Sequence, residues 1–93
     1  MELPDEVKAL LDGEGRITRW PSKRSIQLLV LDYLATRIET GRHYTEKELN
    51  ALLNQWHTFG DPALLRRELF ELGRVNRSKD GSAYWATPKT QLR

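Results

Sequence analysis

The chain has 93 residues, with 15 lysines and arginines against 13 aspartates and glutamates, so its formal net charge is only +2. This length suits one domain with a modest core, and the nearly balanced charge is weak support for a nucleic-acid partner. The lack of cysteine excludes disulfides and thiolate metal sites, and no apolar run approaches the roughly 20 residues of a membrane span. The N-terminus lacks a secretion signal, so we expect a cytoplasmic protein.

A short helix is expected first, opened by Pro4-Asp5-Glu6, with one apolar stripe formed by Val7, Leu10 and Leu11. Ile17 and Trp20 follow in a short extended piece. We interpret Trp20 as a core anchor between the first two helices. The densest basic cluster of the sequence surrounds it, and basic residues interleaved with an aromatic ring can also bind a nucleic-acid backbone.

The longest expected helix runs from Lys23 to Glu39, with Ser22 as its N-cap. Its apolar residues cover more than half of its circumference: Ile26, Leu28, Val30, Leu31, Leu34, Ala35 and Ile38. A helix that is apolar nearly all round is buried on more than one side. We therefore expect the N-terminal helix to pack on one side of it and the next two helices on the other.

Two amphipathic helices joined by a tight corner are expected between Tyr44 and Gly73. Thr45 followed by Glu48 fits a capping box, and Asp61-Pro62 supplies an N-cap carboxylate before a proline at the first helical position. Spacings of three and four residues give each helix one apolar face, formed by Leu49, Leu52, Leu53 and Trp56 and by Leu65, Leu69 and Leu72. This arrangement indicates a helix-turn-helix unit.

After this unit, the spacing of the apolar residues becomes that of strands. Asp80-Gly81 suits a two-residue type I′ turn. The resulting register places Val75 opposite Ala86 and Arg77 opposite Tyr84. With a very short strand at His43-Tyr44, the order is helix, strand, helix, helix, hairpin, which is typical of a winged helix. We predict a mostly α fold with a small β-hairpin, a winged helix-turn-helix with an added N-terminal helix.

The expected organisation has three parts. Residues 1–21 form the N-terminal helix and an extended segment that packs on the core, residues 22–87 form the winged-helix domain, and residues 88–93 form a flexible tail. Phe70 lies off the leucine face of its helix. We expect the N-terminal extension to cover this ring, and the alternative is an interface with another chain.

Four runs of residues stand out in order: Trp20-Pro21-Ser22-Lys23-Arg24, Tyr44-Thr45-Glu46-Lys47-Glu48-Leu49-Asn50, Leu64-Leu65-Arg66-Arg67-Glu68-Leu69 and Tyr84-Trp85. Together they resemble a bacterial domain-of-unknown-function family of winged-helix type, over nearly the whole chain. The resemblance implies a domain that occurs alone or attached to helix-turn-helix transcriptional regulators. Where such a domain follows a separate DNA-binding module, the resemblance leaves open a sensing or pairing role.

In a helix-turn-helix, the second helix enters the major groove. With its leucines turned inward, Arg67 points away from the core and Arg66 lies on a flank. We predict that both contact bases or phosphates, because an outward arginine can bind O6 and N7 of guanine. DNA-backbone contacts are predicted for Lys23, Arg24, Lys47, Arg77 and Lys79. The alternative for Arg67 is an ion pair with Glu71, one turn later.

Enzymatic chemistry has no support in the sequence. His43 and His57 are the only histidines, and no metal-ligand spacing, phosphate-binding glycine loop or activated nucleophile is present. We therefore expect no enzyme, no metal, no cofactor and no small-molecule substrate.

The first hypothesis is a DNA-binding transcriptional regulator that acts on double-stranded DNA, as a homodimer or with a partner regulator. It predicts a continuous positive face across the second helix and the wing. The second is a protein-interaction or regulatory module that binds no nucleic acid, motivated by the balanced charge and by Glu68 and Glu71. It predicts an exposed apolar patch near Phe70 or Trp85. RNA binding is a third hypothesis, which the sequence does not separate from the first.

Overall fold

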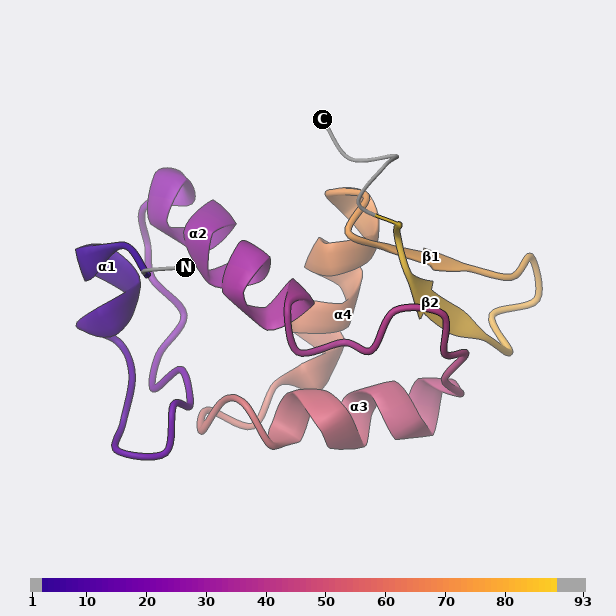
Figure 1. The fold of residues 1–93 in the computed structure, drawn as a ribbon, viewed down its shortest axis with the longest axis horizontal. Coiled ribbons are helices and arrows are strands. Elements are labelled where there is room, and N and C mark those ends of the chain that lie inside the picture. Colours follow the sequence, from indigo (N-terminus) through magenta and orange to yellow (C-terminus); the bar gives the residue numbers. More distant parts are fainter. Residues whose placement is uncertain (1–2, 89–93) are drawn as a thin grey trace.

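The computed structural model describes residues 3–88, and the elements follow one another in the predicted order (Figure 1). They are α1 (Asp5–Lys8), α2 (Arg24–Ala35), α3 (Glu46–Asn54), α4 (Pro62–Glu71), β1 (Val75–Arg77) and β2 (Tyr84–Ala86). Helices α3 and α4 form the helix-turn-helix and the β1–β2 hairpin is the wing, which confirms the predicted fold class. The tail expected at residues 88–93 lies outside the described part from residue 89 onward. Within residues 3–88, no helix has the length and apolar character that a bilayer crossing requires.

Helices α3 and α4 begin at the predicted residues. The Glu48 N–H donates to Thr45 Oγ1 at 3.1 Å and the Thr45 N–H donates to Glu48 Oε1 at 2.8 Å, which completes the capping box. The Leu64 N–H donates to Asp61 Oδ1 at 3.1 Å, and Pro62 occupies the first turn of α4. Both helix starts are therefore determined by side chains within four residues of the cap.

Gly73 ends α4, as predicted, in the left-handed region at φ 82°. The Arg74 N–H donates to the Leu69 carbonyl at 2.8 Å and the Gly73 N–H donates to the Phe70 carbonyl at 3.0 Å. These are the paired bonds of a Schellman motif, which satisfies carbonyls at the end of a helix. The chain leaves the helix here and enters β1 almost at once.

Helix α2 is shorter at both ends than the predicted span from Lys23 to Glu39. Its N-cap is Lys23 and not Ser22, because the Lys23 carbonyl accepts the first helical hydrogen bonds, and no side chain caps this end. At the other end, the Thr36 hydroxyl donates to the Tyr33 carbonyl at 2.6 Å, and the next backbone bonds are of the tighter i to i−3 type. The last predicted turn is therefore not α-helical.

The core includes the N-terminal segment. Helix α2 packs against α1 and against α4, one of the two helices expected on its other side (Figure 1). The largest fully buried side chains come from all four helices, from β1 and from the segment before α2, and they are Val7, Ile17, Val30, Leu31, Leu34, Leu49, Leu53, Leu65, Leu69 and Val75. Because they form one cluster, the N-terminal segment and the winged helix share a single core, and Trp20 packs against it from a partly buried position.

The predicted register of the hairpin is confirmed. Strands β1 and β2 are antiparallel, with Val75 opposite Ala86 and Arg77 opposite Tyr84. On the other side of β2, Tyr44 forms a single bridge with Tyr84, in which each N–H donates to the other residue's carbonyl at 2.7 Å. The short strand expected before α3 is thus one bridged residue, and it joins the loop before α3 to the wing.

The turn at the wing tip is not the predicted type I′ turn at Asp80-Gly81. A type I′ turn needs positive φ at both central residues, whereas Gly81 has φ 75° and no described residue other than glycine has positive φ. The Gly81 N–H instead donates to the Ser78 carbonyl at 3.0 Å. The Asp80 side chain accounts for the difference, because its Oδ1 accepts from the Ser82 N–H at 3.0 Å and from the Ser78 hydroxyl at 2.8 Å.

The corner between α3 and α4 is closed by the buried ring of His57, which is 3% exposed. The Asp61 N–H donates to Nε2 at 3.0 Å, so this nitrogen carries no proton. Nδ1 then donates to the Leu53 carbonyl at 2.6 Å. The neutral imidazole therefore connects the last turn of α3 to the N-cap residue of α4.

We predict that His57→Ala lowers the free energy of unfolding by about 2–4 kcal/mol, because it removes the acceptor of the Asp61 N–H and one of the two hydrogen bonds to the Leu53 carbonyl and opens a cavity. Chemical denaturation followed by circular dichroism measures the change. His43→Ala is the matched control, because His43 is exposed and its ring stacks on Trp85. Its effect should stay below about 1 kcal/mol. Equal losses in the two variants would contradict the role assigned to His57.

Candidate nucleic-acid interface

Helix α4 presents Arg67 to solvent. Leu65 and Leu69 of the same helix are fully buried, and Arg67, on the opposite side, is exposed. The alternative ion pair between Arg67 and Glu71 is absent, and neither side chain pairs with any other residue in the range 3–88. The donors of the Arg67 guanidinium are therefore available to a ligand.

Arginines from two other elements flank Arg67. On one side, Arg24 at the start of α2 donates to Glu68 of α4 at 2.8 Å. On the other, the Arg77 guanidinium of β1 lies over the Phe70 ring of α4, 4.4 Å from its centroid. Glu68 and Phe70 lie to either side of Arg67 around the α4 axis. Lys23 is next to Arg24 in the sequence, and Lys79 is at the wing tip. Together with the three arginines they form what we call the basic strip: Lys23, Arg24, Arg67, Arg77 and Lys79.

The Arg77 contact corrects the expectation that the N-terminal extension covers Phe70. Helix α1 packs on α2 at one end of the molecule, and the wing lies at the other end (Figure 1). Phe70 is partly buried beneath the Arg77 side chain. A guanidinium can cover an aromatic face while its N–H edges remain hydrated, so the ring needs neither the extension nor a second chain.

Arg66, the neighbour of Arg67, is turned inward. Its side chain is 17% exposed, donates to Asn50 Oδ1 and lies 3.7 Å from Glu46 Oε1, both on α3. Its guanidinium also lies 5.9 Å from the centroid of the Tyr84 ring on β2. Arg66 therefore connects α3, α4 and the hairpin. Lys47 is exposed in the first turn of α3, a helix that contributes no residue to the basic strip.

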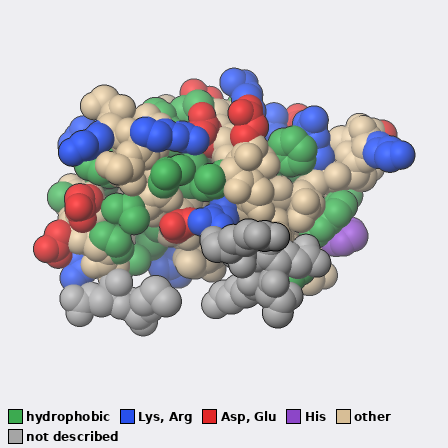
Figure 2. Space-filling view, turned by 90° about the horizontal axis from the view of Figure 1, so that it is seen from above, with side chains coloured by type: hydrophobic (Ala, Val, Ile, Leu, Met, Phe, Trp, Pro, Cys, Tyr) green, Lys and Arg blue, Asp and Glu red, His purple; other side chains and the backbone are tan. Residues whose placement is uncertain are grey.

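Acidic side chains interrupt the positive charge around α4. Glu68 pairs with Arg24, and Glu71 is exposed one turn after Arg67. Figure 2, which shows one side of the molecule, has basic groups in blue interspersed with acidic groups in red. The continuous positive face that we expected for a DNA-binding winged helix is therefore replaced by a discontinuous strip.

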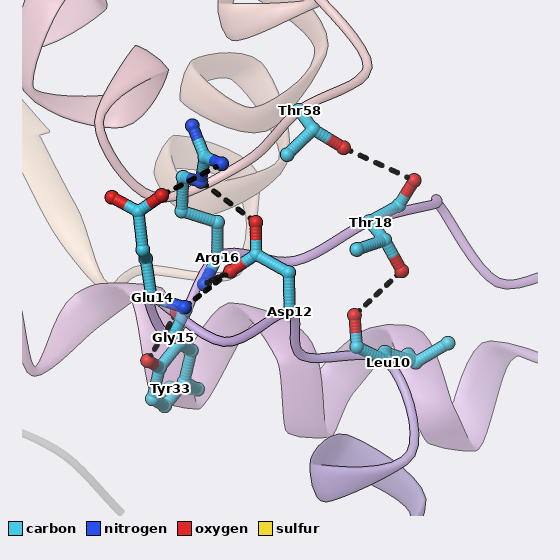
Figure 3. Close-up of polar contacts among 8 residues, drawn as sticks. All are labelled: Leu10, Asp12, Glu14, Gly15, Arg16, Thr18, Tyr33 and Thr58. Carbon is cyan, nitrogen blue, oxygen red and sulfur yellow. Dashed lines mark hydrogen bonds and ion pairs between the residues drawn. The ribbon is translucent and has the colours of Figure 1, made fainter.

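The extended segment before α2 pairs with the corner that orients α4. The Ile17 N–H donates to the Trp56 carbonyl at 2.8 Å, and the Thr58 N–H donates to the Ile17 carbonyl at 2.9 Å, on either side of the corner histidine. The Thr18 hydroxyl donates to the Leu10 carbonyl at 2.6 Å, which joins this segment to the end of the α1 region (Figure 3). Three segments of the chain therefore meet at the corner of the helix-turn-helix.

A closed loop leads into this segment. Asp12 Oδ1 accepts from the Glu14 and Arg16 N–H groups, each at 2.9 Å, and Oδ2 accepts from Arg16 Nε at 2.8 Å (Figure 3). These bonds lower the pKa of Asp12, and the bond from the Arg16 N–H contributes most. The Tyr33 hydroxyl donates to the Gly15 carbonyl at 2.6 Å, and a Cβ at Gly15, where φ is +79°, would lie 3.2 Å from that hydroxyl. The contact with Tyr33 depends on how α2 packs.

The wing tip presents Lys79 on a hydrogen-bonded turn. Lys79 is exposed and has no hydrogen bond or ion pair with another described residue. Next to it, the hydrogen bond from the Ser82 N–H, with those from the serine hydroxyls, lowers the pKa of Asp80 to about 2. The charged carboxylate therefore stabilises the turn at neutral pH, and the turn positions Lys79.

The sequence matches the model of a known protein family. The sequence model of a family described as uncharacterized protein conserved in bacteria (DUF2087) matches residues 16–86, from the segment that pairs with the corner to the end of β2. This agrees with the resemblance to a bacterial domain of unknown function. No curated protein and no solved structure matches the chain.

We predict that the turn at the wing tip loses stability only in strong acid. The pKa of Asp80 is about 2 in the fold and 3.8 ordinarily, so its stabilising effect is complete above about pH 4 and is lost as the pH falls towards 2. The Ser82 amide resonance, followed by NMR across this range, should titrate with a midpoint near 2. Asp80→Asn should abolish the titration. A midpoint near the ordinary 3.8 would contradict the hydrogen bonds assigned to this carboxylate.

Proposed function

This chain belongs to DUF2087, a family of uncharacterized proteins conserved in bacteria, and we propose that it is a winged-helix DNA-binding protein that acts in transcription. One observation carries the proposal: exposed Arg67 on the second helix of the helix-turn-helix has an arginine of another element on either side of it. The Arg77 guanidinium already lies over an α4 ring, so it loses less conformational freedom when it binds a duplex.

In the proposed complex, the N-terminal half of α4 enters the major groove, which is wide enough for a helix. Arg67 contacts the edge of a guanine or a phosphate. Arg77 and Lys79 of the wing bind the DNA backbone on one side of α4, and Lys23 and Arg24 bind it on the other. Contacts on both sides fix the orientation of α4 across the groove.

Arg66 and Lys47 have different parts in this proposal. Arg66 is engaged with α3, so it positions α4 and does not contact DNA itself. This assignment replaces the predicted base or phosphate contact of Arg66. Lys47 is exposed near the N-terminus of α3 and supplies a further contact with a phosphate.

We propose double-stranded DNA as the partner and the bacterial cytoplasm as the location. A helix-turn-helix protein that reads a specific site commonly does so as a dimer, with half-sites about one helical turn apart. A homodimer or a pair with another regulator would supply the second half. The proposal includes no membrane contact, no small-molecule substrate and no enzymatic step.

A second candidate is a protein-interaction module that binds no nucleic acid. One observation favours it: Glu68 and Glu71 bring negative charge to the helix that would enter the groove. The apolar patches expected for such a module are partly covered, because Phe70 lies beneath a guanidinium and the Trp85 ring stacks on His43 at 4.9 Å between centroids. DNA binding is therefore the better supported function.

We predict that the protein binds labelled random duplex DNA in a fluorescence anisotropy titration. If about five phosphates are contacted, affinity should fall roughly 500-fold between about 50 and about 200 mM salt, because bound counterions are released. Arg67→Glu and Arg77→Glu should each abolish binding at the higher salt concentration. Each reversal places a negative charge against the phosphates.

Arg42→Glu is the control for these charge reversals. Arg42 is exposed, pairs with Glu39 at 3.7 Å and lies outside the basic strip, so this variant should bind nearly as the wild type does. If the wild type fails to bind even at low salt, DNA binding is excluded for this chain and the protein-interaction module takes its place.

A further prediction concerns the acid that pairs with the basic strip. Glu68→Gln should raise the affinity for duplex DNA roughly fivefold, about 1 kcal/mol, because it removes a negative charge from α4 and releases Arg24. The control is Glu39→Gln, which removes the partner of Arg42 outside the strip and should leave affinity nearly unchanged. Weaker binding of Glu68→Gln would show that the ion pair is needed to place Arg24.

A further inference from the structure

A shallow pocket of about 350 Å³ lies between α4 and the wing. Arg66 and Arg67 of α4 and Arg77 of β1 line it, together with two acidic side chains and the rings of Phe70 and Tyr84. The pocket therefore brings three guanidinium groups from two elements to one small concave surface. Such a concentration of arginines suits an anionic group with several oxygens.

Two of the three arginines have free donors. Arg66 is engaged by Asn50 and Glu46 on α3. Arg67 and Arg77 have no hydrogen bond or ion pair with any other residue described in the structure. The carboxylate of Glu46 is thus already opposed by Arg66, which leaves Glu71 against two unpaired arginines, and the free part of the pocket is net positive.

The Phe70 ring determines how Arg77 is presented. The Arg77 guanidinium carbon lies over the Phe70 ring, 4.4 Å from its centroid, and its N–H groups form no hydrogen bond with another described residue. A stacked guanidinium keeps its edge donors free and loses little further conformational freedom when it binds a phosphate through two of them. Phe70, on α4, therefore couples the orientation of a wing residue to the helix.

We propose that this pocket is the binding site for one phosphodiester group of the DNA backbone, with Arg77 and Arg67 as its ligands and Phe70 as the positioning residue for Arg77. The inference rests on the proposed DNA-binding function and deepens it. It assigns a specific purpose to a large apolar ring that a helix entering a groove would otherwise not carry. Phe70 does not touch the phosphate, and it acts only through Arg77.

The test measures how the affinity for duplex DNA depends on salt, because the slope reports the number of phosphates bound. Arg77→Gln and Phe70→Leu should each reduce the slope of log K against log salt by about 0.9, the value for one phosphate. The double variant should show the same slope as Arg77→Gln alone, because Phe70 acts through that side chain. Phe70→Tyr keeps the ring and should retain the wild-type slope.

The matched control is Arg37→Gln. Arg37 also stacks on an aromatic ring, with its guanidinium 4.4 Å from the centroid of Trp56, but it lies outside the basic strip. Its substitution should leave the slope unchanged. Thermal melts verify that each variant is folded at the assay temperature. Inorganic phosphate at matched ionic strength should not displace the duplex, and displacement would show a site for a free anion instead.

The outcomes separate this inference from the proposed function. Two results would contradict the phosphate pocket and leave DNA binding in place. The first is that the wild type binds DNA and Phe70→Leu keeps the full salt slope. The second is that the slope reductions of Phe70→Leu and Arg77→Gln add in the double variant. If Phe70→Tyr reduces the slope as much as Phe70→Leu does, the contact of Arg77 with an aromatic ring is not the cause of the reduction. Failure of the wild type to bind overturns both.

Discussion

The orientation of α4 depends on one buried ring, the neutral imidazole of His57. It accepts a hydrogen bond from the N-cap residue of α4 and donates one to the last turn of α3. On either side of it, the backbone of Ile17 pairs with the corner. An unpaired polar group in this place would be costly, so these hydrogen bonds stabilise the observed arrangement of the corner. The positions of the arginines in the basic strip depend on that arrangement. Helix α4 carries Arg67, and its Glu68 and Phe70 contact the two flanking arginines.

Much of the fold could be predicted because its determinants act over a few residues. Thr45, Asp61 and Gly73 begin or end helices through bonds to their near neighbours. The hairpin register also follows from local spacing, although the turn type does not. Asp80 binds Ser82 and thereby adopts a turn that its position before a glycine does not indicate. The start of α2 also differs from the prediction. Ser22 is a residue type that commonly caps helices, but the N-cap is Lys23 and no side chain caps this end.

The candidate site was less predictable because contacts between distant elements place its side chains. Arg66 and Arg67 are adjacent, and helical periodicity predicts only that one points outward and the other lies on a flank. Asn50 and Glu46 decide that Arg66 turns inward. The pairing of Arg24 with Glu68 joins residues 44 positions apart. Neither contact leaves a pattern in a single sequence, and the same holds for the contact of Arg77 with Phe70.

The pairing of Ile17 with the corner also constrains the order in which the chain folds. Its two backbone bonds join segments that are far apart in the sequence, and such contacts form late because a long loop must close first. Helices α3 and α4 begin at local caps that do not involve these bonds. During synthesis, the segment around Ile17 leaves the ribosome before the corner that it pairs with exists. An early part of the chain therefore completes a corner made of later residues.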